Sequence, residues 1–390
     1  MKKFDKNKYL KKSKLHRWWQ NYSKYFYIGI PYVLCLAFIF VVSMFVFNKN
    51  HELVDKESLA VFIDDVKTDS FPSKGTVTFL KADCDNNATI EWDKDSWGLF
   101  VSNLTKKTKC NLYFKNLESI NDKLNDLVNS DTTNIASDDP DGNIRYIGAS
   151  PSNYVYFNCS DYDNQTSDTC EIWRIIGLFK DINKEDGTKE DLVKIIKDDS
   201  IGSVAWDTNN SNNWANASLK SNFNSGNYYN ITLKNDTTRN MIESVVWKLG
   251  STTSFIGDSD GNPSSLYSVE RNSSNSNNWT GKIALMYPSD YGYAVGGSDR
   301  ATCLSKSLYN WSSMPTCYDN NYLYKANIYQ WTLMTNNLTG SYVYAVKSNG
   351  GFNYGNAYST DDARPSLFLK SSIIINSGDG SSTKPYQLSF

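Results

Sequence analysis

The chain has 390 residues, of which 40% are hydrophobic and 21% are charged, so its composition favours packed domains and excludes a wholly disordered protein. Of the 40 basic and 42 acidic side chains, residues 1–50 hold 10 and 1, and the other 340 residues hold 30 and 41. This acidic main body excludes nucleic acid as its partner, because phosphate contacts need clustered Lys and Arg. The two histidines are His16 and His51, so the rest of the chain has no histidine-dependent nucleophile or metal site.

A stretch of 23 residues without a charged side chain, Tyr25–Phe47, is long enough to span a bilayer as a helix. The tail before it, residues 1–24, is rich in Lys, whereas the charges that follow the stretch are balanced. By the positive-inside rule the tail stays in the cytoplasm and the remainder is exported. The sequence therefore predicts a single-pass plasma-membrane protein with a signal-anchor helix over residues 25–47 and extracellular C-terminal domains. A cleaved signal peptide is the alternative, which the long apolar run disfavours.

After the apolar stretch, the sequence is first rich in charged residues and then shows the alternation that is typical of β-strands. Residues 48–70 are charged and predict a stalk with a short helix over Leu53–Val66. Residues 71–116 alternate apolar and polar side chains, which predicts a small β-sandwich-like module. Its predicted strands are Thr76–Leu80, Ala88–Trp92, Gly98–Val101 and Cys110–Phe114.

The C-terminal two thirds predict a helix and linker over residues 117–143, then one large domain over residues 144–390. The fold class predicted for this domain is α+β and β-rich, with long loops that Trp side chains keep ordered. Helical patterning within it is limited to Asn216–Phe223 and Thr238–Trp247. The predicted strands are Tyr154–Phe157, Glu171–Phe179, Leu192–Ile196, Ile283–Met286, Tyr342–Val346, Ser366–Leu369 and Ile373–Ile375.

Six cysteines follow the apolar stretch as three local pairs, which suits an exported protein stabilised by disulfides. Connectivity does not follow from sequence, and unpaired buried thiols are the alternative. We expect nearest-neighbour pairing, namely Cys84–Cys110, Cys159–Cys170 and Cys303–Cys317.

Two acidic loops place oxygen ligands at alternate positions, as calcium requires. These loops are Asp139–Asn143 and Asp258–Asn262, but Ser150 and Val269 stand where an EF-hand has its last Glu. Turns are therefore the preferred interpretation and no cofactor is predicted. Calcium binding through irregular loops stays open.

Paired carboxylates perform acid–base chemistry without histidine in glycoside hydrolysis. Asp361 and Asp362, Glu270 and Asp290 are candidates by residue type, but nothing in the sequence places two of them across a cleft. The chain also lacks the glycine-rich motifs that cradle nucleotide phosphates. The sequence therefore predicts that the protein is not an enzyme.

Several segments resemble a group of exported surface proteins from low-GC bacteria. Glu171–Phe179 resembles the W-R-I-I-G-x-F opening strand of that group, and three later segments resemble its closing signature. The chain departs from the signature at Met334–Asn336 and at Ala363. The later segments are Trp331–Met334, Tyr342–Gly350 and Ala363–Leu367.

Domains of that group have no assigned function and look similar to the C-type-lectin-like fold of formylglycine-generating enzymes. The resemblance therefore implies a C-type-lectin-like fold for residues 144–390, with Trp331 and Arg364 in structural roles. The enzymatic activity is not carried over, because Cys303 and Cys317 match no motif of those enzymes. The loop region before the final strand commonly forms the ligand surface of this fold, which implies as ligand contacts Tyr342, Tyr344, Phe352, Asn353, Tyr354, Asn356 and Tyr358.

Taken together, these features predict a membrane-anchored surface protein that recognises a glycan, a cell-wall component or a protein without catalysis. Its predicted partners are the membrane, through residues 25–47, and an extracellular ligand. One alternative is a structural surface or pilus-like assembly component whose aromatic surface is a subunit interface. A further alternative is an enzyme, either a carboxylate-based hydrolase or a cysteine-based oxidase. The oligomeric state stays open.

Overall fold

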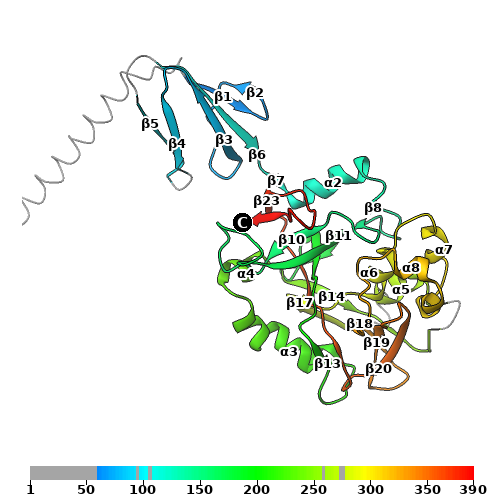
Figure 1. Cartoon of the computed structure of the whole chain (residues 1–390). Coiled ribbons are helices and arrows are strands. Elements are labelled where there is room, and N and C mark those ends of the chain that lie inside the picture. Colours follow the sequence, from blue (N-terminus) through cyan, green and yellow to red (C-terminus); the bar gives the residue numbers. More distant parts are fainter. Residues whose placement is uncertain (1–58, 94–95, 104–107, 257–259, 272–276) are drawn as a thin grey trace, which may run out of the picture. The chain divides into compact units, whose positions relative to one another are not determined.

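The computed structural model describes residues 59–93, 96–103, 108–256, 260–271 and 277–390. The chain divides into two compact units, Met1–Asn116 (unit 1) and Leu117–Phe390 (unit 2), shown in Figure 1. Each unit has its own cluster of buried hydrophobic side chains.

The described part of unit 1 consists of strands and the turns and loops between them. A four-stranded sheet has the order β2-β1-β6-β3, and a separate hairpin is formed by β4 and β5. Trp92 of the hairpin packs against Phe79 and Phe114 of the sheet, with ring centroids 5.4 and 5.3 Å apart. The strands are β1 (Leu59–Ile63), β2 (Val66–Thr68), β3 (Val77–Cys84), β4 (Thr89–Asp93), β5 (Gly98–Ser102) and β6 (Cys110–Asn116).

The four strands predicted in this module are present, but the helix predicted over Leu53–Val66 is not found in the described part of that range. Residues 59–63 form β1 instead, which pairs in parallel with β6. Asp64 and Asp65 have φ angles of 49° and 63° and connect β1 to β2 as a tight turn. Long-range pairing and the burial of Val61 therefore override the local helical pattern.

Unit 2 contains two large sheets. One has the order β17-β22-β12-β11-β9-β8 with β10 paired to β11, and the other has the order β13-β21-β18-β19-β20 with β15 paired to β18. Smaller sheets are formed by β14 with β16 and by β24, β23 and β7. The strands are β7 (Glu118–Ser119), β8 (Ile135–Ala136), β9 (Ile144–Tyr146), β10 (Tyr154–Phe157), β11 (Glu171–Asn183), β12 (Lys189–Lys197), β13 (Ser203–Ala205), β14 (Val245–Leu249), β15 (Ser251–Thr252), β16 (Asn277–Gly281), β17 (Ile283–Ala284), β18 (Gln330–Asn336), β19 (Tyr342–Val346), β20 (Phe352–Asn356), β21 (Thr360–Asp362), β22 (Ser366–Phe368), β23 (Ile374–Ser377) and β24 (Gln387–Ser389).

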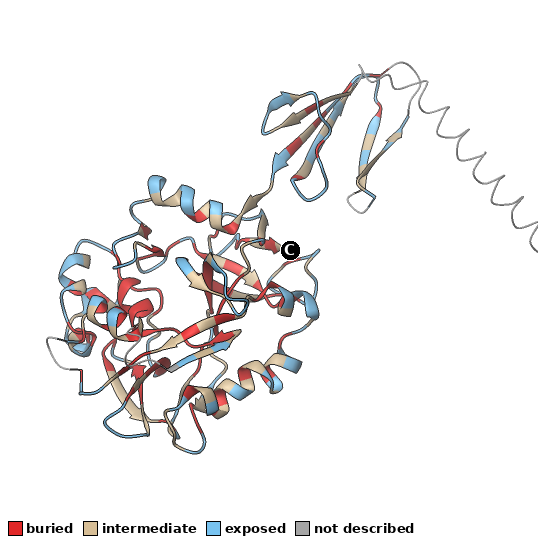
Figure 2. Cartoon of the chain, turned by 180° about the vertical axis from the view of Figure 1, so that it is seen from behind, coloured by how far each residue is buried: buried red, intermediate tan, exposed pale blue. Residues whose placement is uncertain are grey.

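Short helices connect and cover these sheets. In α3, Leu219 and Phe223 lie one turn apart and are both buried, so a single stripe of the helix faces the core (Figure 2). The helices α5 to α8 gather beside β18–β20 in Figure 1. The helices are α2 (Ile120–Ser130), η2 (Trp214–Asn216), α3 (Ser218–Asn224), η3 (Tyr228–Thr232), α4 (Asp236–Met241), α5 (Pro263–Arg271), α6 (Pro288–Tyr293), α7 (Arg300–Leu304), η4 (Leu308–Ser313) and α8 (Pro315–Tyr318).

Two predicted boundaries in unit 2 differ from the structure. The helix predicted over Thr238–Trp247 ends as α4 at Met241, and its second half is strand β14, which pairs with β16. The acidic stretch 131–143, predicted as a linker, carries β8 and buries the side chains of Asp139 and Asn143.

The β-rich character agrees with the sequence prediction, but the transmembrane part of the predicted fold class is corrected. No helix in the described part of the chain is long and apolar enough to cross a membrane. The longest of them, α2, has 11 residues, whereas a membrane-spanning helix needs about 20. The predictions of a single-pass protein, a plasma-membrane location and extracellular domains therefore find no support, and residues 25–47 lie outside the described residues.

Strand β11 is the central strand of its sheet, and Gly177 explains why its sequence motif contains a glycine. Strand β9 crosses so close to Gly177 that a Cβ atom there would overlap the carbonyl oxygen of Ile144. A register shift in the pairing of β11 with β12 also falls between Ile175 and Gly177. The absence of a side chain therefore allows β9 and β11 to pair.

We expect Gly177→Ala to lower the free energy of unfolding by about 1–3 kcal/mol, because backbone atoms of β9 must move to make room. Urea unfolding of the full chain followed by tryptophan fluorescence measures the effect. The control is Gly340→Ala, because a Cβ atom at Gly340 meets no other atom within 4 Å. Equal stabilities for the two variants would contradict this explanation.

Candidate functional site

The three predicted disulfides are confirmed. They join Cys84 to Cys110, Cys159 to Cys170 and Cys303 to Cys317, with S–S distances of 2.03, 2.04 and 2.03 Å. Each closes a loop of fewer than thirty residues, which restricts the unfolded chain locally.

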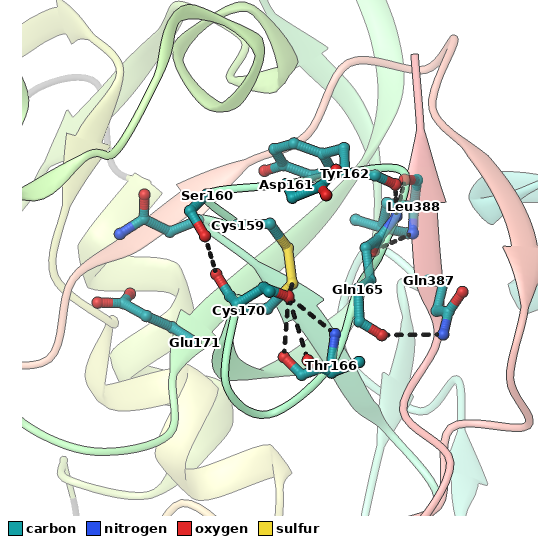
Figure 3. Close-up of a disulfide and its surroundings, with 12 residues drawn as sticks. Cys159, Ser160, Asp161, Tyr162, Gln165, Thr166, Cys170, Glu171, Gln387 and Leu388 are labelled. Atoms are coloured by element: carbon teal, nitrogen blue, oxygen red, sulfur yellow. Dashed lines mark hydrogen bonds between the residues drawn. A yellow bond between two sulfur atoms is a disulfide. The ribbon is translucent and has the colours of Figure 1, made fainter.

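The loop closed by Cys159 and Cys170 holds the C-terminal strand β24 (Figure 3). The side-chain amide of Gln165 donates to the carbonyl of Leu388 at 2.6 Å and accepts from its backbone N–H at 3.0 Å. Gln387 adds a third hydrogen bond, from its side chain to the Gln165 carbonyl at 3.1 Å. The disulfide loop thus serves a structural purpose at the end of the chain.

The predicted ligand contacts lie on the hairpin of β19 and β20, except Tyr358 in the turn after it, and they are not equally accessible. Tyr344 and Phe352 are buried, whereas Tyr358 is 55% exposed. The hydroxyl group of Tyr344 is hydrogen-bonded at 2.9 Å both to Thr252 and to Asn336. Tyr344 and Phe352 therefore belong to the core. The remaining predicted contacts are partly buried, namely Tyr342, Asn353, Tyr354 and Asn356.

The partly exposed aromatic rings of this hairpin stack on one another. Tyr354 contacts both Phe255 and Tyr342, with centroid distances of 4.8 and 4.7 Å. The Tyr354 ring is therefore partly covered by other rings. A sugar that stacks on an aromatic side chain needs a free ring face, so the hairpin offers less for recognition than the sequence suggested.

A hollow of about 220 Å³ elsewhere in unit 2 is a better candidate. We call it the amide pocket. Its residues come from the loop before α3, from β14 and β15, and from the end of β18, and none of the eight carries a charge. They are Asn212, Asn213, Trp214, Leu249, Ser251, Leu333, Thr335 and Asn337.

Hydrogen bonds to the backbone hold the loop of the amide pocket in place. The side-chain amide of Asn212 donates to the carbonyl of Asn336 at 2.9 Å and to that of Tyr342 at 3.3 Å. Below the loop, the Trp206 indole donates to the carbonyl of Thr332 at 3.2 Å. The loop thus lies against β18.

Trp214 is the unusual member of the amide pocket. Its side chain is 2% exposed, and its indole N–H has no hydrogen-bond partner among the described residues. Trp206 and Trp279 hold the ring, with centroids 5.1 and 6.1 Å away. A buried hydrogen-bond donor without a partner lowers the free energy of unfolding by about 1–3 kcal/mol. Such a donor in a folded protein therefore calls for a structural or functional explanation.

The sequence predicted long loops rich in Trp, but Asn212, Asn213 and Trp214 were not among its predicted ligand contacts. Ser251 and Thr335 were not predicted as site residues either. The sequence signal for this pocket was its clustered amides, which in loops either bind backbone groups or face a ligand. These are the run Asn212-Asn213-Trp214 and the pair Asn336-Asn337.

The structure provides no clustered acidic ligands at the loops in the part of the chain that is described. No group of three or more His, Cys, Asp or Glu side chains lies close enough together there to hold a metal ion. The carboxylate of Asp139 instead accepts hydrogen bonds from Arg145 at 2.6 Å and from Asn143 at 2.9 Å. Asp258, in the second loop, lies outside the described residues.

The residues considered for catalysis are engaged in other contacts. Cys303 and Cys317 are buried and disulfide-bonded, so neither provides a thiol. Asp362 accepts hydrogen bonds from Ser200 at 2.5 Å and from Ser203 at 3.2 Å. Burial, followed by the neighbouring Asp362, raises the pKa of Asp361 to about 6.

Glu270 is a fully buried carboxyl at the end of α5. It accepts hydrogen bonds from the backbone N–H of Ser289 at 2.8 Å and from the Ser289 hydroxyl group, and a guanidinium nitrogen of Arg271 lies 3.5 Å from its carboxylate. Burial raises the pKa of Glu270 to about 7, although Arg271 and Ser289 favour the ionised form. The carboxyl group therefore changes charge close to neutral pH.

Comparisons of the chain with known proteins find no matching family model, no similar curated protein and no similar solved structure. The resemblance to bacterial surface proteins and to the C-type-lectin-like fold stays a prediction from sequence.

We expect the free energy of unfolding to fall by about 3 kcal/mol between pH 4.5 and pH 7 through Glu270 alone. In this range the folded state holds a proton that the unfolded state has already lost, so raising the pH favours unfolding. Above the folded pKa the contribution is constant.

Urea unfolding at several pH values measures this contribution as the difference between the wild-type chain and Glu270→Gln. The wild-type chain should lose stability relative to the variant as the pH rises through this range. Parallel pH profiles would show that Glu270 has an ordinary pKa.

Proposed function

We propose that the protein is a recognition protein and that the amide pocket binds a small uncharged ligand rich in hydroxyl groups. A single sugar ring is the chemical class that suits the pocket best. The observation that carries this proposal is the lining of the pocket, which is polar but uncharged. Trp214, whose buried indole N–H lacks an acceptor among the described residues, belongs to that lining, and a ligand hydroxyl group is the acceptor that we propose for it.

The absence of charge supports a neutral ligand. The eight side chains that line the amide pocket are amides, hydroxyls, an indole and two leucines. A charged ligand would lose its hydration there without gaining an ion pair, which is costly. The volume of about 220 Å³ lies below the range of drug-sized ligand pockets, so we expect a small ligand or one unit of a longer chain.

The polar groups in the pocket include both hydrogen-bond donors and acceptors, and a hydroxyl group can bind to both. The amide nitrogen of Asn212 is used by backbone carbonyls, which leaves its oxygen as an acceptor. The hydroxyl group of Thr335 forms no hydrogen bond with another described residue, so it can serve a ligand as either donor or acceptor. A sugar hydroxyl group donates one hydrogen bond and accepts others, so these groups and the Trp214 N–H can be satisfied together.

Binding measured by calorimetry on the full chain tests the proposal. The probes are glucose, galactose, mannose and N-acetylglucosamine, with glucuronate as the charged counterpart. We expect saturable binding of at least one neutral sugar and weaker binding of glucuronate. Thr335→Val keeps the shape of the side chain and removes its hydroxyl group, so it should weaken binding about 3- to 10-fold, the value of one neutral hydrogen bond.

Two further variants complete this experiment. Trp214→Phe removes the indole N–H and should weaken binding about tenfold. Thr360→Val is the matched control, because Thr360 is exposed on β21 of the same sheet and does not line the pocket. Absence of binding by all four neutral sugars, or binding that Thr335→Val leaves unchanged, would contradict the proposal. Concentration-dependent self-association without sugar binding would favour the assembly component instead.

A further inference from the structure

A second hollow in unit 2 has a different chemical character from the amide pocket. Its volume is about 200 Å³, and its walls come from the segment before β9, the end of β11, β14, α5, the residue before α6 and β22. We call it the cationic hollow, because Lys180, Lys248 and Arg271 all line it.

Arg271 stacks on a tyrosine ring and forms one long hydrogen bond, from a guanidinium nitrogen to Glu270. Its guanidinium carbon lies 3.6 Å from the centroid of the Tyr267 ring. Its nearest carboxylate atoms belong to Glu270 and Asp141, at 3.5 and 3.7 Å, which is longer than a good hydrogen bond. The side chain is 24% exposed. Its Nη2 nitrogen has no partner among the described residues and is available for a ligand, and the planar guanidinium suits a carboxylate.

Lys248 and Lys180 add two further positive charges. Neither ammonium group forms a salt bridge or hydrogen bond with another described residue. The backbone of Lys248 is fixed by Tyr287, whose hydroxyl group accepts from its N–H at 3.0 Å and donates to its carbonyl at 2.9 Å. Lys248 is half-buried, so its charge is only partly hydrated.

Aromatic side chains form much of the remaining wall. Trp247, Tyr287 and Phe368 line the hollow and are 1%, 6% and 4% exposed. Their rings pack together, with Trp247 and Phe368 centroids 5.2 Å apart. This apolar surface favours a ligand that has an apolar body beside its charge.

Two carboxylates oppose the three cations at the hollow. Asp141 accepts a hydrogen bond from the Tyr267 hydroxyl group at 2.5 Å, which partly satisfies it. The carboxylate of Asp181 is exposed and has no partner among the described residues. The lining therefore has an excess of one positive charge, and Asp181 is its most unfavourable group for an anion.

We propose that the cationic hollow binds a small organic carboxylate with a flat apolar body. The carboxylate accepts from the Arg271 guanidinium and lies near the Lys248 ammonium, while the body packs on the aromatic wall. This site is independent of the amide pocket and of the function proposed for it.

Calorimetry on the full chain with benzoate, benzamide and inorganic phosphate tests the proposal. Benzoate should bind saturably, and benzamide, which has the same shape without the charge, should bind at least about tenfold more weakly. Arg271→Gln should weaken benzoate binding about tenfold or more, and Lys248→Gln about threefold. Asp181→Asn should strengthen it about twofold, because a like charge is removed.

Two controls separate this site from other effects. Lys220→Gln removes a half-buried lysine of α3 that is not at the hollow, and Thr335→Val alters the amide pocket, so both should leave benzoate binding unchanged. Equal affinity for benzamide would overturn the role of the cations, and equal affinity for phosphate would overturn the role of the apolar wall. Absence of benzoate binding, or insensitivity to both Lys248→Gln and Asp181→Asn, would overturn the site itself.

Discussion

The ion cluster around Asp290 is the constraint on which the rest of unit 2 depends. Asp290 lies in α6 and accepts from Lys194 of β12 at 2.5 Å and from Arg145 of β9 at 3.0 Å. Arg145 also binds Asp139, and all four side chains are almost completely buried. Burial acts to raise the pKa of Asp290, but Lys194 and Arg145 hold it below its ordinary value. Because an unpaired buried charge costs about 3–5 kcal/mol, the cluster fixes α6 against the sheet.

The position of α6 is linked to both candidate sites through strand β14. Tyr287 immediately precedes α6, and its hydroxyl group is bonded to the backbone of Lys248 in β14. Lys248 lines the cationic hollow, and the next residue, Leu249, lines the amide pocket. Strand β14 therefore contributes residues to two sites of different chemistry. The neutral pocket suits hydroxyl groups, whereas the charged hollow suits a carboxylate.

The sequence predicted secondary structure well where apolar and polar residues followed a regular pattern. It predicted secondary structure poorly where tertiary contacts determined the conformation. Strands such as Tyr154–Phe157 and Tyr342–Val346 were correct, because their apolar residues match a strand in a packed sheet. The helices α5 to α8 were missed, since they have between four and nine residues and show little periodicity. The predicted contacts Tyr344 and Phe352 proved to be core residues, because aromatic composition does not reveal whether a ring faces solvent or the interior.

The sequence by itself determined the β-rich character, the spacing of six cysteines as three local pairs and the absence of histidine chemistry after residue 51. These properties depend on composition or on residues close together in the chain. Only the tertiary structure decided that Asn212, Ser251 and Thr335 meet in one pocket, and that Arg271 stacks on Tyr267 beside Lys248. Such groupings arise from long-range packing of strands and loops, which no local pattern of residues encodes.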